Sequence, residues 1–367
     1  MNCIPELKPI DSLFQMESLW YKTELWETPR NQLLAEAVNW HIEQCPLYRT
    51  LYKKAEVDSE KILENGPKGI ELLPIRGFKH FGDQLTSVSE QEKISVFESS
   101  GTMGKTSQVM RDELSISRLL GSVELGVRNI ANTFEDSTVI LIGPDLENAG
   151  NVWFSYVMAL VELLYPTISV INGDLINFVL AYDLLSDPSF GPKVIVGVPP
   201  VIWDVMQGAI ENKVNFNNVT HIITGGGWKR RSGEEVSFQV LNETANKCSK
   251  KNKIKICDTF NMVEMNTVLF KCEADYFHTP PWLVLEALDP YNLQPVPPNI
   301  PGILAFYDAS SRSYPGFILT EDVIALAPPE SCTCGRAGER MRFIRRVRNS
   351  ENRGCAKKID KIVTKGV

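Results

Sequence analysis

Residues 96–112 read VFESSGTMGKTSQVMRD, and they follow a β-like run and precede a helical one. The seven residues from Ser99 to Lys105 combine hydroxyl side chains, two glycines and a lysine. Backbone N–H groups of a glycine-rich turn, together with serine and threonine hydroxyls, form a concave set of donors that suits phosphate oxygens. The stretch therefore predicts a phosphate-binding loop. An ordinary serine–glycine turn is the alternative when the loop is taken alone.

The spacing of the glycines separates this loop from the Walker A loop of P-loop NTPases. A Walker A loop requires a glycine five positions before Gly104. Position 99 is a serine, so the spacing disfavours a P-loop NTPase.

In the rest of the chain, segments with the apolar spacing of helices alternate with segments that have the pattern of strands. Helical spacing covers residues 31–54, 113–133, 151–165, 201–212 and 233–247. Short β-branched runs between them read TVILIGPD (138–145), KVIVGVPP (193–200) and HIITGGG (221–227). Strands that alternate with helices predict an α/β fold in which helices cover both faces of a parallel sheet.

The pattern changes at Lys253, after which shorter strands follow one another without long helices. Such a pattern predicts a more antiparallel or barrel-like part of the chain. The expected organisation is a helical N-terminal region (1–85), an α/β core (86–252), a smaller β-rich subdomain (253–340) and a basic tail (341–367) that carries Cys355.

Composition limits the classes of protein to which the chain can belong. The 367 residues carry a net charge of -7, and basic residues are scattered until the last thirty, which disfavours nucleic acid as a partner. The N-terminus has no basic-then-apolar leader, and the longest apolar stretch, Val152–Tyr165, contains Glu162 and is too short to span a bilayer. The eight cysteines are irregularly spaced, which favours thiols over a disulfide framework. We therefore expect a cytoplasmic protein with small-molecule or protein partners, and a homo-oligomer is left open.

Four motifs resemble, in the same order, those of the adenylate-forming enzymes, the superfamily of acyl-CoA synthetases, aryl-CoA ligases and peptide-synthetase adenylation domains. SSGTMGK (99–105) is similar to their phosphate loop, TGGGWK (224–229) to the glycine turn beside the adenine, and FNMVE (260–264) to the element whose glutamate holds magnesium. LTED (319–322) resembles the element whose aspartate takes the ribose hydroxyls, with Glu321 in place of a glycine. The resemblance implies the superfamily's large N-terminal domain over residues 1–340, with ATP and Mg²⁺ as cofactors.

Elementary chemistry supports the roles that the resemblance implies. A carboxylate that attacks the α-phosphate builds up negative charge, which oriented N–H groups, a cation such as Lys105 and Mg²⁺ can stabilise. Glu264 would hold Mg²⁺ and Asp322 would accept the ribose hydroxyls, although a structural glutamate and a turn aspartate are the alternatives. The other residues assigned to the nucleotide are Ser99, Ser100, Gly101, Thr102, Gly104, Gly225, Gly226, Gly227, Phe260 and Asn261.

A narrower resemblance covers nearly the whole chain. Long stretches are similar to the LuxE-type acyl-protein synthetases of the bacterial luminescence fatty-acid reductase complex, among them NVWFSYVMALVELLYPT (151–167), HTPPWLVLEALDP (278–290) and DASSRSYPGFILTEDV (308–323). In that family a fatty acid is adenylated with ATP, and the acyl group passes to a cysteine near the C-terminus. A partner reductase, a LuxC-like subunit, then takes it on to aldehyde. The matching cysteine is Cys355, and the family's hinge-region arginine matches Arg345 or Arg346, of which Arg346 is preferred.

The end of the chain differs from the wider superfamily. Most adenylate-forming enzymes continue into a mobile C-terminal domain with a catalytic lysine, whereas 12 residues follow Cys355 here. We therefore expect that domain to be absent, which favours an acceptor thiol on the chain over free CoA. Arg353, Lys357 and Lys358 flank Cys355, and neighbouring cations lower the pKa of a thiol. A buried cysteine that acts as a small hydrophobe is the alternative.

A second pair of cysteines stands in Cys332-Thr333-Cys334-Gly335-Arg336, which resembles an element of phenylacetate–CoA-ligase-type enzymes. Structural zinc requires four ligands, so Cys257, Cys272 or a histidine would have to join this pair. A plain turn is the favoured interpretation.

The sequence thus predicts an ATP-dependent acyl-protein synthetase that activates a carboxylic acid, expected to be a long-chain fatty acid, and carries the acyl group on Cys355. An acyl- or aryl-CoA ligase is the alternative enzyme. A catalytically silent subunit of a reductase complex is the alternative from another class.

Overall fold

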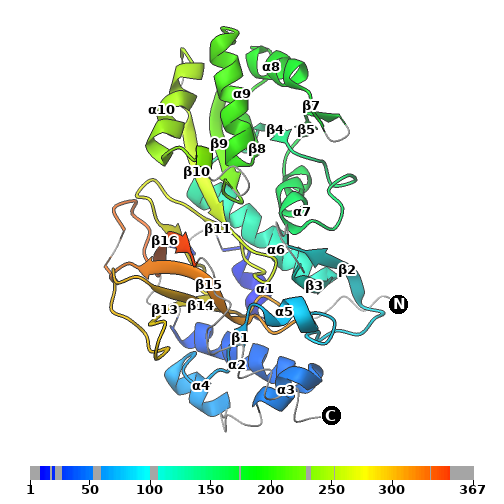
Figure 1. Ribbon diagram of the computed structural model, residues 1–367, viewed down its shortest axis with the longest axis vertical. Helices are drawn as coiled ribbons and strands as arrows, with labels where there is room; N and C mark the ends of the chain where they lie inside the picture. Colours follow the sequence, from blue (N-terminus) through cyan, green and yellow to red (C-terminus); the bar gives the residue numbers. More distant parts are fainter. Residues whose placement is uncertain are drawn as a thin grey trace. The chain divides into compact units, whose positions relative to one another are not determined.

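The computed structural model describes residues 9–16, 19–20, 27–52, 59–99, 106–172, 175–228, 233–251, 253–330 and 332–347. The chain forms two compact units (Figure 1). Unit 1 comprises Met1–Ser122, Val263–Thr267 and Ala274–Val367, and unit 2 comprises Val123–Met262 and Val268–Glu273. Within the described ranges, no helix has the length and apolar character needed to cross a membrane.

Unit 2 is built on a six-stranded sheet with the strand order β11-β10-β9-β8-β4-β5. All neighbouring strands are parallel except β11, which runs antiparallel to β10. The strands are β4 (Thr138–Ile142), β5 (Thr167–Ser169), β8 (Lys193–Gly197), β9 (Val219–Gly225), β10 (Lys255–Phe260) and β11 (Leu269–Phe270). β8 is buried along its whole length, as expected for a parallel sheet with both faces covered. The α/β prediction is confirmed.

Helices of unit 2 connect these strands, and three of them share one apolar core with the sheet. The helices are α7 (Trp153–Ala159), the 3₁₀ turn η3 (Leu160–Leu163), α8 (Phe178–Ser186), α9 (Pro199–Glu211) and α10 (Phe238–Cys248). A short hairpin, β6 (Ile171–Asn172) and β7 (Leu175–Ile176), precedes α8. Side chains of α8, α9 and α10 pack against Ile140, Ile195 and Ile222 of the sheet. These helices therefore bury one face of the sheet.

The position of β10 differs from the sequence prediction. The sequence pattern assigns residues from 253 onward to the β-rich part, whereas β10 lies parallel to β9, with Asp258 opposite Thr224. A parallel strand is brought into its sheet by the crossover helix before it, here α10. The chain then returns antiparallel through β11, so no helix follows to signal that β10 belongs to the α/β sheet.

Unit 1 contains the antiparallel β-rich part. Its main sheet has the order β12-β16-β15-β14-β13, and β1 pairs in parallel with β15. The strands are β1 (Leu73–Pro74), β12 (Phe277–His278), β13 (Leu283–Leu288), β14 (Gly302–Asp308), β15 (Phe317–Leu326) and β16 (Arg340–Arg346). A separate hairpin consists of β2 (Lys93–Glu98) and β3 (Gln108–Asp112).

The helices of unit 1 are α1 (Pro9–Leu13), α2 (Glu27–Gln44), α3 (Pro46–Tyr52), α4 (Ser59–Asn65) and α5 (Gly77–Phe81), and α6 (Glu113–Gly126) begins in this unit. The single helix predicted at residues 31–54 is two helices, because Pro46 lacks an N–H group and disfavours helical geometry in Cys45. The helix predicted at 113–133 ends as a π-helical turn, η2 (Val127–Ala131), and Asn132 closes it with a φ of 58°.

Candidate active site

The loop at residues 100–105 lies outside the described residues, and so do the predicted site residues Ser100, Gly101, Thr102, Gly104 and Lys105. The two strands that carry the loop are described. The Ser99 N–H donates to the Ser107 carbonyl, and the Ser107 N–H donates to Ser99 Oγ, each at 3.0 Å. Ser99 therefore closes the base of the loop. The loop joins two antiparallel strands, β2 and β3, and α6 begins only after β3.

Arg111 on β3 is a buried cation that the sequence analysis did not single out. Its Nε donates to Asn266 Oδ1 at 3.0 Å, and its Nη2 donates to the Val263 carbonyl at 2.7 Å and to the Tyr314 hydroxyl at 2.9 Å. The side chain is fully buried. Arg111 therefore fastens the strand that follows the loop to the segment that contains Glu264. The available signal was an arginine that directly follows the apolar pair Val109 and Met110 in a short strand.

Glu264 lies in the segment that Arg111 holds, and it is 3% exposed. Burial raises the pKa of its carboxyl group. A hydrogen bond with the Ser107 side chain and the charges of Arg346 and Arg111 oppose that rise. The carboxylate thus faces the base of the loop and two cations within unit 1.

Asp322 and Arg346 are paired in the same unit. They lie opposite each other on β15 and β16, and Arg346 Nε is 3.3 Å from Asp322 Oδ1. Burial raises the pKa of Asp322, and the charge of Arg346 opposes that rise. Arg345 instead lies opposite Val323 and its side chain is exposed. Of the two arginines that the sequence left open, Arg346 is therefore the one that pairs with Asp322 and whose charge acts on Glu264.

The glutamate that replaces a glycine beside Asp322 has its own partner. Arg76 Nε donates to Glu321 Oε1 at 2.5 Å. Arg76 follows β1, which pairs with β15 at Leu73–Ile318 and Pro74–Leu319. Glu321 therefore links the residue before α5 to β15. Asp322, the next residue of β15, pairs with Arg346 instead.

The glycine turn in unit 2 follows β9 directly. Gly226 and Gly227 have φ angles of 77° and 64°, which other residues adopt only with strain. A Cβ on Gly226 would lie 2.9 Å from the Phe154 ring, so the turn packs its backbone against that ring. Thr224 donates its hydroxyl to Asp258 at 2.8 Å, and Thr259 donates to the Thr224 carbonyl at 2.8 Å.

Phe260 and Asn261 stand at the end of the neighbouring parallel strand, β10. Trp153 Nε1 donates to Asn261 Oδ1 at 2.5 Å, which orients the amide group. The carboxyl ends of β9 and β10 lie at the same edge of the sheet, because the strands are parallel. Open α/β sheets bind ligands at that edge. Backbone beside an aromatic ring and an oriented amide can hold a flat heterocycle by stacking and hydrogen bonds.

Comparison with known proteins decides the family. The model of the acyl-protein synthetase family, LuxE, matches residues 6–364. The chain is 34% identical over 367 residues to the long-chain-fatty-acid--luciferin-component ligase of Aliivibrio fischeri, covering 97% of this chain and 94% of that protein. It is 35% identical over 332 residues to the ligase of the same name from Vibrio harveyi, covering 89% of this chain and 86% of that protein.

The chain belongs to the LuxE acyl-protein synthetase family. The family resemblance that the motifs indicated is thereby confirmed, and the protein is a ligase.

The fold is that of adenylate-forming enzymes. The structure of 2-hydroxyisobutyryl-CoA ligase in complex with 2-HIB-AMP and CoA matches with a TM-score of 0.72 at 17% identity, over 94% of this chain and 73% of that chain. The predicted fold class is therefore confirmed.

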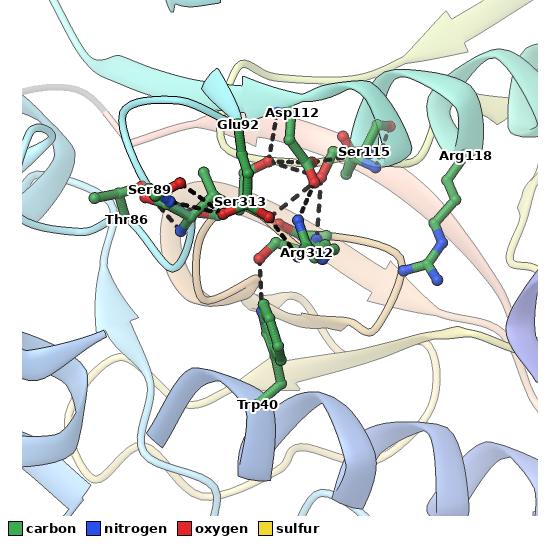
Figure 2. A network of polar contacts seen from close by, with 12 residues as sticks. Trp40, Thr86, Ser89, Glu92, Asp112, Ser115, Arg118, Arg312 and Ser313 are labelled. Atoms are coloured by element: carbon green, nitrogen blue, oxygen red, sulfur yellow. Dashed lines mark hydrogen bonds and ion pairs between the residues drawn. The ribbon is translucent and has the colours of Figure 1, made fainter. Parts of the chain in front are cut away.

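In this LuxE-family chain, a polar network braces the hairpin of the loop from the other end (Figure 2). Asp112, the last residue of β3, accepts from the Ser115 N–H at 3.0 Å, which caps α6. Arg312 donates to Asp112 at 2.5 Å and to Glu92 at 2.8 Å, and Ser313 donates to Asp112 at 2.6 Å. Burial alone would raise the pKa of Asp112, but these hydrogen bonds outweigh it and hold the pKa below its usual value. The stretch DASSRSYPG that resembles the family thus holds β3 and α6 in place.

Proposed function

We propose that the protein activates a long-chain fatty acid with ATP and then carries the acyl group as a thioester on Cys355, for delivery to an acyl reductase. The observation that carries the proposal is the Glu264 carboxylate, buried between Ser107, Arg111 and Arg346 at the base of the hairpin loop. Membership of the acyl-protein synthetase family supports the reaction class. The names of the two curated relatives support a long-chain fatty acid as substrate.

In the proposed first step, a carboxylate oxygen of the acid forms a bond to the α-phosphorus of ATP. The bond from that phosphorus to the bridging oxygen breaks, and pyrophosphate leaves with the electron pair. Charge develops on the phosphate oxygens, where positioned donors and cations stabilise it most. Lys105 and the loop backbone would supply donors to the phosphates, and Arg346, 64% exposed beside Asp322, supplies a second cation.

Each unit contains residues assigned to the nucleotide, Asp322 in unit 1 and the glycine turn with Phe260 and Asn261 in unit 2. Asp322 would accept the ribose hydroxyls through its two carboxylate oxygens. Gly225, Gly226 and Gly227, with Phe260 and Asn261, would hold the adenine. The left-handed glycines and the oriented Asn261 amide support this assignment.

Glu264 fits a magnesium ion. Mg²⁺ in nucleotide sites is bound by one or two carboxylates together with phosphate oxygens and water. A buried carboxylate whose pKa is raised gains from a cation, because the cation favours the ionised form. When bound, Mg²⁺ supplies charge neutralisation on the phosphates.

In the proposed second step, the Cys355 thiolate forms a C–S bond with the acyl carbon. The bond from that carbon to the phosphate oxygen breaks, AMP leaves, and the thiol proton passes to solvent. Cys355 lies outside the described residues. Its basic neighbours Arg353, Lys357 and Lys358 in the sequence favour the thiolate.

The deciding experiment is the intact mass of the protein after incubation with Mg-ATP and a panel of fatty and aryl acids. The wild type is compared with Cys355→Ser, and hydroxylamine tests for a thioester. We expect an ATP-dependent acyl mass on the wild type only, released by hydroxylamine, and the added mass identifies the acid.

Two other results would reject the proposal in different ways. Formation of AMP and of acyl-CoA without a protein adduct would make the protein a CoA ligase. No AMP and no ATP–pyrophosphate exchange with any acid, even with a reductase present, would make it a catalytically silent subunit.

A further inference from the structure

A group of metal-binding side chains lies in unit 1, away from the residues assigned to ATP. His278 is on β12, and Cys332 and Cys334 are in the turn between β15 and β16. Cys334 Sγ is 3.3 Å from His278 Nε2. His278 and Cys332 are buried, at 1% and 5% exposure. These three side chains meet although 54 residues of sequence separate His278 from Cys332.

A fourth candidate ligand is close in sequence. Cys272 precedes His278 by six residues and is buried. One ligand atom from each of Cys272, His278, Cys332 and Cys334 lies within 4.8 Å of the others. The set therefore contains three sulfur atoms and one imidazole nitrogen within reach of a single ion.

The turn that carries two of these cysteines is well defined. The Cys332 N–H donates to the Arg336 carbonyl at 3.0 Å, and the Gly335 N–H donates to the Cys332 carbonyl at 2.9 Å. Gly335 has a φ of 84°, a conformation that favours glycine. Thr333 is exposed while the cysteines on either side of it are buried and half-buried. The alternation turns both thiols toward the interior.

The chemistry of this set matches zinc. Three thiolates and one imidazole form the Cys₃His ligand set of structural zinc sites. With Zn–S and Zn–N bonds of about 2.1–2.3 Å, tetrahedral ligand atoms are about 3.6–3.8 Å apart. The Cys334 Sγ–His278 Nε2 distance is 3.3 Å and all four ligand atoms lie within 4.8 Å of one another, limits that include that spacing. Four protein ligands leave no open position for a substrate, which is the mark of a structural site.

The charges around the set also suit a zinc centre. Zn²⁺ with three thiolates carries a net charge of −1, and a buried anionic centre is stabilised by nearby cations. Arg340 lies opposite His278 across β12 and β16. Arg336 follows Cys334 by two residues and is 7% exposed.

We propose that His278, Cys332 and Cys334, with Cys272 as the fourth ligand, bind one structural Zn²⁺. Within unit 1, the ion would cross-link β12 to the turn between β15 and β16. β15 and β16 carry Asp322 and Arg346, so the ion would stabilise the sheet that presents them. The proposal does not depend on the proposed reaction. The plain turn favoured from the sequence becomes the alternative.

Cys257 supplies a matched control for this site. It was among the candidates that the sequence left open, and it is buried like the proposed ligands. Its thiol instead donates to the Lys271 carbonyl at 3.1 Å, and it is not a member of the four-residue group. Cys257→Ala therefore removes a buried thiol without removing a proposed ligand.

The test measures the metal content of full-length protein, purified without chelators and after removal of any histidine tag. The variants are His278→Ala, Cys272→Ser, Cys332→Ser with Cys334→Ser, and Cys257→Ala. We expect about one zinc per chain in the wild type and in Cys257→Ala. We expect at least a tenfold loss in Cys332→Ser with Cys334→Ser, and a clear loss in the other two. Zinc retained at the wild-type level in all variants would overturn the proposal.

Variants that fail to fold would not leave the question open, because the wild type itself gives a second readout. Zinc-depleted wild-type protein is titrated with Co²⁺ under reducing conditions. A tetrahedral thiolate site gives thiolate-to-cobalt charge-transfer and ligand-field bands that saturate at one equivalent and that Zn²⁺ abolishes. Absence of these bands, or a disulfide among the four residues found by alkylation before and after reduction, would overturn the proposal.

Discussion

Asp322 and Arg346 face each other across the antiparallel strands β15 and β16, with Oδ1 and Nε 3.3 Å apart. The pair is asymmetric, because the Asp322 side chain is 7% exposed and that of Arg346 is 64% exposed. The charge of Arg346 also acts on the buried Glu264. The charge of one solvent-exposed arginine therefore acts on two buried carboxylates, Asp322 and Glu264.

Replacement of Arg346 by alanine should lower the rate of ATP–pyrophosphate exchange by about 100-fold, the typical cost of removing a group that stabilises transition-state charge. Arg345→Ala is the matched control, since Arg345 is also an exposed arginine of β16 but lies opposite Val323 instead of Asp322. We expect Arg345→Ala to retain near wild-type exchange. Equal losses in the two variants would remove Arg346 from the site.

Glu264→Gln should separate stability from activity. The folded-state pKa of Glu264 is raised above its usual value of 4.5. Its contribution to stability is therefore full below that usual value and is lost as pH rises through the raised pKa. At pH 8 the wild type must bury an ionised carboxylate, whereas glutamine is neutral. The variant should therefore be at least as stable as the wild type at pH 8. Its advantage in urea midpoint should be smaller at pH 5.

The same variant should lose adenylation activity, because glutamine cannot hold Mg²⁺ as a carboxylate does. Urea unfolding at both pH values and pyrophosphate exchange measure the two effects. A variant that is less stable than the wild type at pH 8 would contradict the assignment of burial as the dominant influence on Glu264.

Arg111→Met should be costly for stability. The substitution leaves the Asn266 amide oxygen, the Val263 carbonyl and the Tyr314 hydroxyl oxygen without the N–H donor that Arg111 supplies to each. Breaking a buried set of charged hydrogen bonds typically costs about 3–5 kcal/mol. The exposed Arg128, paired with Glu124 one helical turn away, is the control, and Arg128→Ala should cost about 0.3–0.5 kcal/mol. Denaturant midpoints compare the two, and a similar small loss for Arg111→Met would show that it does not fasten β3.

Two neighbouring glycines should respond differently to alanine. Both have positive φ angles, but a Cβ on Gly226 would lie 2.9 Å from the Phe154 ring, whereas Gly227 has nothing within 4 Å. Gly227→Ala should cost about 1–2 kcal/mol from backbone conformation alone. Gly226→Ala should cost a further 1–3 kcal/mol or so from the clash. The KM for ATP should rise more in Gly226→Ala, and the reverse order would place the adenine elsewhere.

Local sequence predicted most of unit 2. The strands around Ile140, Ile195 and Ile222 are short β-branched runs separated by amphipathic helices, and that pattern depends only on near neighbours in the chain. The local pattern did not assign β10 to this sheet, because that assignment depends on pairing with β9 and not on the residues of β10 alone. It also missed the break at Pro46, where helical periodicity continues across the two helices.

The residue types and their order along the chain determined the family and the identity of the candidate carboxylates, because motifs such as FNMVE and LTED carry chemistry in their side chains. The tertiary structure alone decided which side chains meet. It brought Arg346 rather than Arg345 to Asp322, placed Arg111 against the segment of Glu264, and gathered His278 with Cys332 and Cys334. Strand register and burial set these contacts, and both arise from interactions between residues that are far apart in the sequence.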